Sequence, residues 1–119
     1  MKLFWNKCEN DMEYKLESVD LNDKHFDDLS GVYVIWTNVN DRSVIRVGQG
    51  NISKWLYKHR NDPNIIKYKK DGTLLVSWAA VPDGLQEGVE AYLAHKLRPL
   101  EGVRFPIDCL IPVNLPGEV

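Results

Sequence analysis

Residues 31–50 read GVYVIWTNVNDRSVIRVGQG, and this stretch decides the fold. The run GVYVIWTN is rich in β-branched and aromatic side chains at successive positions, which is typical of a central strand with both faces buried. A polar turn separates it from a second run, SVIRVG. The pattern therefore predicts an antiparallel hairpin over residues 31–48.

A helix, a strand and a second helix are expected after the hairpin. Gly48-Gln49-Gly50 ends the second strand, and Asn51 is a suitable N-cap for a helix over residues 52–62. Residues 73–81, TLLVSWAAV, predict a third strand of the buried type. Residues 85–98 repeat apolar side chains at helical spacing up to a proline, so they predict the second helix.

This order predicts an α/β fold, a small sandwich whose three-stranded, mostly antiparallel central sheet is flanked by helices. Three strands bury both of their faces only when helices cover them. Residues 31–119 then form one globular domain, and residues 1–30 form an N-terminal extension packed on it. The proline-containing tail should run extended over the surface or as an edge strand.

Composition excludes several classes of protein. The chain has 119 residues, of which 44% are apolar, too many for a disordered chain. It contains no apolar run of the roughly 18 residues that a membrane span needs, and no secretory h-region near its start. Two cysteines, Cys8 and Cys109, are too few for a disulfide scaffold. A cytoplasmic protein without a membrane partner is expected, and its oligomeric state is left open.

The net charge of −2 conceals an uneven distribution. Residues 1–41 carry −5 and residues 71–119 carry −4, whereas residues 42–70 carry +7. A basic block can create a local positive field that attracts polyanions. The alternative is a solvated face whose charges pair with the acidic ends once the chain folds.

Three side chains combine reactive groups with positions in or beside the predicted core. Tyr33 lies in the first strand, where it either packs with its hydroxyl satisfied or takes part in proton transfer. His59 falls on the apolar face of the first helix, either bonded to a backbone carbonyl or as an acid–base group. Glu90 borders the apolar stripe of the second helix, where it either holds a cation such as Mg²⁺ or pairs with a basic neighbour.

Taken in order, short motifs of the chain resemble the GIY-YIG nuclease superfamily over about residues 31–114. Gly31-Val32-Tyr33 is similar to the first motif, and Arg46-Val47-Gly48 is similar to the second. Glu90 matches the glutamate that binds the metal in that family, and Asn114 matches the asparagine that commonly closes the domain. The resemblance also places His59 in the helix that bears the catalytic arginine of the family.

Two positions depart from the family pattern. The second motif usually begins with tyrosine, and here that residue is Arg46. The catalytic arginine of the helix aligns with Trp55. Arginine can neutralise phosphate charge but cannot act as a base at ordinary pH. Removal of a proton would then fall to Tyr33, to His59 or to a metal-bound water.

The resemblance implies an endonuclease, a hydrolase that cuts phosphodiester bonds with one Mg²⁺ or Mn²⁺ ion on Glu90. The expected catalytic residues are Tyr33, Arg46, His59 and Glu90. The residues expected to bind nucleic acid, DNA more than RNA, are Arg46, Lys54, Lys58, Arg60 and Asn114. Whether the chain is an enzyme stays open, because Arg46 and Trp55 favour a catalytically inactive module that binds nucleic acid or protein on the same fold. A small-ligand enzyme of unrelated chemistry has no supporting constellation of residues.

Overall fold

The computed structural model describes residues 1–6, 14–38, 43–102 and 109–116. The strands are β1 (Tyr14–Lys15), β2 (Ser30–Thr37), β3 (Val44–Asn51) and β4 (Leu74–Ala80). The α-helices are α1 (Ile52–Arg60), α2 (Pro63–Ile66) and α3 (Gln86–Leu97). Short 3-10 helices are η2 (Lys24–Phe26), η3 (Lys67–Asp71) and η4 (Asp83–Leu85). The order of hairpin, helix, strand and helix is the predicted one.

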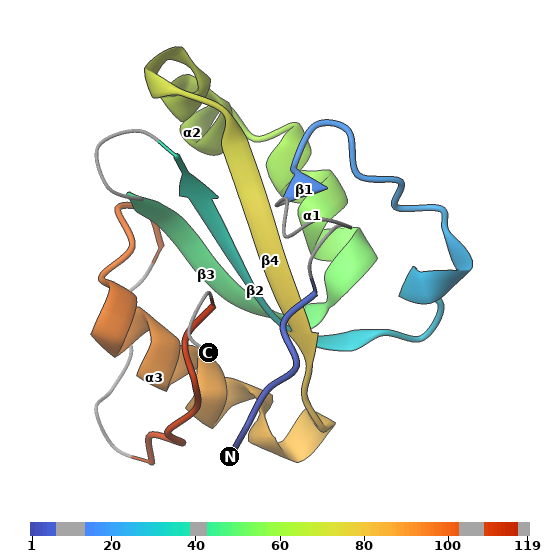
Figure 1. Cartoon of the computed structure of the whole chain (residues 1–119), viewed down its shortest axis with the longest axis vertical. Helices are drawn as coiled ribbons and strands as arrows, with labels where there is room; N and C mark the ends of the chain where they lie inside the picture. Colours follow the sequence, from blue (N-terminus) through green and yellow to red (C-terminus); the bar gives the residue numbers. More distant parts are fainter. Residues whose placement is uncertain (7–13, 39–42, 103–108, 117–119) are drawn as a thin grey trace.

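The strands form one antiparallel sheet in the order β1-β4-β2-β3 (Figure 1). This confirms the α/β class and the antiparallel sheet flanked by helices. β2 is central, and its Tyr33 lies opposite Gly48 of β3 and opposite Trp78 of β4. The structure adds a fourth strand to the predicted three, because β1 pairs with β4. A strand of two residues has no periodicity that a sequence pattern can reveal.

Helices α1 and α3 cover opposite faces of the sheet (Figure 1). Successive residues of a strand point to opposite faces. On β2, Tyr33 and Ile35 therefore join the core on the α1 side, whereas Val32 and Val34 join the core on the α3 side. Burial of both faces explains why the β2 sequence is apolar without alternation.

The N-terminal extension contributes to both cores. Leu16 and Phe26 are buried on the α1 side, and Leu3 is buried on the α3 side. The amino group of Met1 donates to the carbonyl of Pro112 at 3.1 Å, so the first residues run beside the C-terminal tail. Residues 109–116 form neither helix nor strand, and the middle of the tail, like Cys8, lies outside the described residues.

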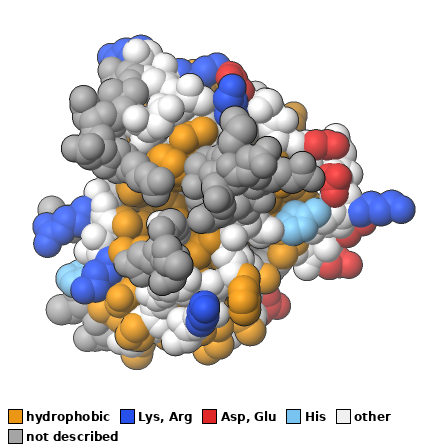
Figure 2. Space-filling model, in the orientation of Figure 1, with side chains coloured by type: hydrophobic (Ala, Val, Ile, Leu, Met, Phe, Trp, Pro, Cys, Tyr) orange, Lys and Arg blue, Asp and Glu red, His pale blue; other side chains and the backbone are white. Residues whose placement is uncertain are grey.

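The surface shown in Figure 2 gathers hydrophobic side chains over its middle, and most of its Lys and Arg side chains lie singly near its edge. The predicted basic block therefore does not form one continuous patch on this face. Within residues 1–6, 14–38, 43–102 and 109–116, no helix is both long and apolar enough to cross a membrane.

Candidate functional site

A buried tyrosine–histidine pair lies on the α1 side of the sheet. The hydroxyl of Tyr33 on β2 is 2.6 Å from Nε2 of His59 on α1. Tyr33 is 1% exposed and His59 is 3% exposed, so this hydrogen bond lies in the interior of the protein. The second ring nitrogen of His59, Nδ1, is buried and has no hydrogen-bond partner among the described residues. The expectation of a core histidine satisfied by a backbone carbonyl is therefore not met at either ring nitrogen.

Gly48 makes room for the Tyr33 hydroxyl. The two residues face each other across β2 and β3, and a Cβ atom on Gly48 would overlap the phenol oxygen. In the sequence Gly48 belongs to a motif and ends a strand, and neither feature shows that it faces Tyr33. The hairpin register, once counted from the turn, is the signal that pairs it with Tyr33.

Arg46 of β3 pairs with Ile35 of β2, so its side chain starts on the same face of the sheet as Tyr33. Its positive charge acts on the ionisation of Tyr33, of His59 and of Glu90, so the guanidinium lies close to all three. Its Nε atom is buried and has no hydrogen-bond partner among the described residues. Buried donors are nearly always paired. The Nε donor could therefore take an added anionic acceptor, while the charge of the guanidinium already acts on the carboxyls of Glu90 and Glu101.

The ionisation of the pair follows from its burial. Burial raises the pKa of Tyr33 above its ordinary value, and the charge of Arg46 opposes that rise. Burial and, second, the charge of Arg46 lower the pKa of His59 to about 4. Both groups are therefore neutral near pH 7. The tautomer of His59 decides which of the two bonded atoms donates.

Glu90 lies on α3, which covers the opposite face of the sheet, and its charge acts on the ionisation of Tyr33. Its side chain is only 8% exposed, and burial raises its pKa to about 7 against the lowering effect of Arg46. It forms no ion pair of 4.0 Å or less with a described residue, which differs from the expected alternative of a Glu paired with a basic neighbour. Glu87, one turn earlier, is exposed, as the helical wheel predicted.

A single Mg²⁺ or Mn²⁺ ion fits Glu90 better than a metal held by several side chains. The described residues contain no cluster of three His, Cys, Asp or Glu side chains that could enclose an ion. Magnesium is commonly bound through one or two carboxylates while keeping several waters, and it also binds substrate phosphates. A buried carboxylate without an ion-pair partner is consistent with that mode.

Trp55 and two lysines lie beside the pair on α1. The indole of Trp55 stacks on the His59 ring, with centroids 6.0 Å apart and planes 27° apart. The ammonium group of Lys58 lies over the indole, 4.7 Å from its centroid. Lys54 and Lys58 are both exposed. In the sequence Trp55 marks only a departure from a family pattern, whereas the structure places it against His59.

Arg60 and Asn114 already have internal partners. Nε and Nη2 of Arg60 donate to the carbonyls of Leu16 and Val19 at 3.0 and 2.7 Å. The amide of Asn114 accepts from the backbone N–H of Leu3 and donates to its carbonyl. Their role in binding nucleic acid stays a prediction. Their described contacts attach the N-terminal extension to the rest of the fold rather than extend the site.

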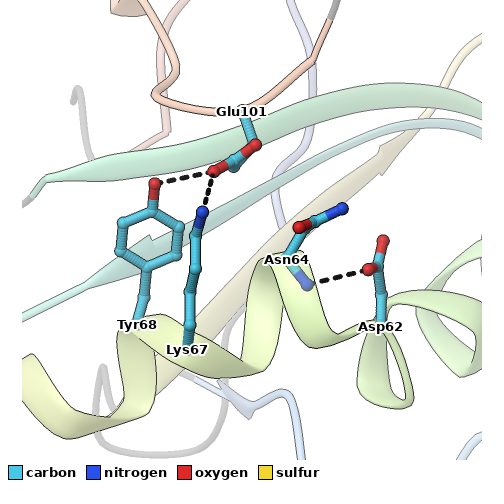
Figure 3. A network of polar contacts seen from close by, with 5 residues as sticks. All are labelled: Asp62, Asn64, Lys67, Tyr68 and Glu101. Carbon is cyan, nitrogen blue, oxygen red and sulfur yellow. Dashed lines mark hydrogen bonds and ion pairs between the residues drawn. The ribbon is translucent and has the colours of Figure 1, made fainter.

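The basic block divides into paired and unpaired members. Lys67 and the hydroxyl of Tyr68 both contact Glu101, at 2.9 and 2.8 Å (Figure 3). In the same view Asp62 caps the start of α2. Lys69 pairs with Glu17 at 2.6 Å. Lys67 and Lys69 thus pair with acidic residues from the two ends of the chain, as the alternative for the basic block expected. Among the described residues, Lys54 and Lys58 form no such ion pair.

The network around Glu101 was not foreseen from the sequence. Backbone N–H groups of Leu100 and Glu101 donate to the carbonyls of Val44 and Ile45, so this segment covers part of the β3 edge next to Arg46. A single glutamate after a helix carries no local signal of such a role.

No known protein family, curated protein or solved structure matches this chain. The similarity to the GIY-YIG superfamily therefore stays a prediction from its motifs. The chemistry of the site is argued below from the residues that the fold brings together.

Proposed function

We propose that this chain hydrolyses phosphodiester bonds of nucleic acid. In this proposal Arg46 binds the phosphate, and Tyr33 with His59 moves the proton of the attacking water. The observation that carries it is the buried Nε of Arg46, which has no hydrogen-bond partner among the described residues, together with a buried tyrosine–histidine pair. A phosphate oxygen is the acceptor that suits a guanidinium best, because the bond is charge-assisted.

Tyr33 is suited to relaying a proton and unsuited to losing one for long. Because its pKa is raised, a tyrosinate would be short-lived at neutral pH. In the tautomer in which Nε2 of His59 accepts, Tyr33 can pass its proton to that nitrogen as its oxygen takes one from water. The water oxygen then bonds to phosphorus, the bond to the leaving oxygen breaks, and His59 ends as an imidazolium.

Phosphate binding prepares His59 for this step. The charge of Arg46 is the second cause of the low pKa of His59. A phosphate on Arg46 offsets that charge, so the pKa of His59 rises when substrate is bound. The histidine becomes a better proton acceptor only in the complex, which couples proton transfer to substrate binding.

Glu90 is the residue that would hold the divalent cation. When bound there, such an ion supplies Lewis-acid stabilisation of charge on the phosphoryl group. Glu90 must first lose its proton, and its pKa of about 7 makes cation binding compete with protonation near neutral pH. Activity should therefore rise as the pH rises through neutrality.

The test is cleavage of plasmid, single-stranded DNA and RNA by purified protein with Mg²⁺ or Mn²⁺. Glu90→Gln should slow cleavage by roughly 100-fold or more, the usual cost of removing an electrostatic stabiliser. Glu87→Gln is the matched control, since Glu87 is exposed on the same helix, and it should cut at the wild-type rate. No cleavage of any substrate, or equal rates for the two variants, would contradict the proposal.

A catalytically inactive binding module is the second candidate. Trp55 with the exposed Lys54 and Lys58 forms an aromatic and cationic surface that needs no turnover to bind nucleic acid. Binding that weakens steeply with salt in a protein that cuts nothing would favour this module over the enzyme.

A further inference from the structure

Trp55 is held in a defined position at the edge of the site. A Cβ atom on Gly50 would lie 2.9 Å from the indole Nε1, so the backbone of Gly50 approaches the ring closely. Gly50 also has a φ of +118°, which a residue with a side chain rarely adopts. Trp55 packs against the core on the α1 side while staying only partly buried. The indole is therefore an ordered ring that still reaches the surface.

The Trp55 indole contacts His59, one of the two residues proposed to move the proton. It stacks on His59, which in turn bonds to the Tyr33 hydroxyl at 2.6 Å. The Tyr33 and His59 rings have centroids 5.4 Å apart, and of the three rings Trp55 is the one that is only partly buried. The ammonium group of the exposed Lys58 also lies over the indole, 4.7 Å from its centroid, and could move from there to a backbone phosphate.

We propose that Trp55 stacks on the base of an unpaired nucleotide next to the scissile phosphate, so that the substrate is a single-stranded polynucleotide. This inference rests on the proposed function and specifies its substrate class. A base within a duplex has both faces covered by its neighbours, whereas an unpaired base offers a face to an aromatic side chain. The positive charges of the exposed Lys54 and Lys58, on the same helix as Trp55, complement the backbone of such a strand.

Equilibrium binding without cleavage tests this inference. Fluorescence anisotropy compares labelled single strands of about 16 nucleotides, oligo-dT and oligo-rU, with a duplex of the same length, in chelator and at low salt. Trp55→Leu keeps an apolar side chain but removes the aromatic face, and Trp55→Phe keeps a smaller aromatic face. Circular dichroism and the unfolding midpoint show whether each variant is folded.

Wild type should bind one or both single strands more tightly than the duplex. Trp55→Leu should weaken single-strand binding by roughly 5- to 150-fold and leave duplex binding nearly unchanged, since one stacked base contributes about that much. Trp55→Phe should retain most of the affinity. A preference for oligo-dT indicates DNA and a preference for oligo-rU indicates RNA, and either is consistent with the inference.

Several results would overturn it. These are tighter binding of the duplex, equal losses on duplex and single strand in folded Trp55→Leu, or no loss on either. If the protein cuts duplexes and depends on Glu90 but not on Trp55, the inference fails and the proposed function stands. If single strands bind through Trp55 but are never cut with metal present, the proposed function fails and the binding site stands.

Discussion

Gly48 is the residue whose replacement should disturb the site most directly. Gly48→Ala places a methyl group on the Tyr33 hydroxyl, and Tyr33 is 1% exposed and cannot move aside freely. Overpacking of this kind costs about 1–3 kcal/mol of unfolding free energy. Chemical denaturation with urea measures this cost. Gly84→Ala is the control, because a Cβ atom there meets nothing within 4 Å. Equal stability of the two variants would show that Gly48 has no such packing role.

Burial of His59 and burial of Glu90 should change the free energy of unfolding with pH in opposite directions. The pKa of His59 falls from 6.5 to about 4 in the fold. The unfolded chain alone therefore binds a proton between these values, and stability is lost as the pH falls. The pKa of Glu90 rises from 4.5 to about 7, so the folded state keeps a proton and stability is lost as the pH rises. Each effect amounts to roughly 3 kcal/mol and the two partly cancel in the wild type.

Single variants should separate these two contributions. In chelator, Glu90→Gln should become more stable as the pH rises from about 4.5 to about 6.5, because the His59 effect is then unopposed. His59→Gln should show the opposite slope over the same range. Urea denaturation at several pH values gives both slopes. Parallel profiles for wild type and both variants would mean that neither group is perturbed by burial.

Local periodicity made some site residues predictable and left others hidden. The apolar strand pattern placed Tyr33 in the core, and the helical wheel placed His59 on an apolar face and Glu90 at its border, because both signals depend only on neighbours in sequence. The unpaired donor of Arg46 depends on what surrounds it in space. Asn114 bonds to Leu3 across 111 positions of the chain, and no local pattern encodes that contact.

At the scale of elements, the stability of α1 depends on its N-cap, Asn51. The side chain of Asn51 accepts a hydrogen bond from the backbone N–H of Lys54 at 3.1 Å, which caps the helix that carries Trp55 and His59. Asn51→Ala should cost about 1 kcal/mol of unfolding free energy. Asn64→Ala, at an exposed position in α2, should cost less than half of that. Thermal unfolding of the two variants compares them, and a smaller loss for Asn51→Ala would exclude a capping role.

Element boundaries followed the strength of the local signals. The second helix was predicted over 85–98 and is α3, Gln86–Leu97. The first was predicted over 52–62 but α1 ends at Arg60, because Asp62 caps the next helix rather than continuing this one. An Asp followed by a Pro is a local signal for the start of a new helix, and helical periodicity alone does not contain it. β1 escaped prediction because it exists only through its pairing with β4.

At the scale of the whole molecule, the N-terminal residues complete the α3-side core. Leu3 is 3% exposed and the adjacent Phe4 is 82% exposed. Leu3→Ala should therefore cost about 2–5 kcal/mol, and Phe4→Ala about 0.5 kcal/mol or less. Denaturation of the two variants under one condition tests this. Similar losses would mean that the extension is not part of the core.

The radius of gyration, 13.3 Å, is close to the roughly 13.5 Å expected for one compact domain of this length. The single-domain scale was predictable from length and apolar content. The use of the basic block was not, because opposite charges from both ends of the chain neutralise Lys67 and Lys69 only after folding. Among the described residues, the exposed Lys54 and Lys58 on α1 form no ion pair, so their charges are open to a ligand.

The proposed hydrolysis depends most on Tyr33, the group that moves the proton of the attacking water. The measurement is the single-turnover rate of metal-dependent cleavage of a single strand by wild type, Tyr33→Phe and Tyr57→Phe. Tyr57 is 62% exposed on α1, so its variant is the control and should react like wild type. Tyr33→Phe should stay folded, bind the strand and cut it roughly 100-fold or more slowly. A folded Tyr33→Phe protein that cuts as fast as wild type would contradict the account.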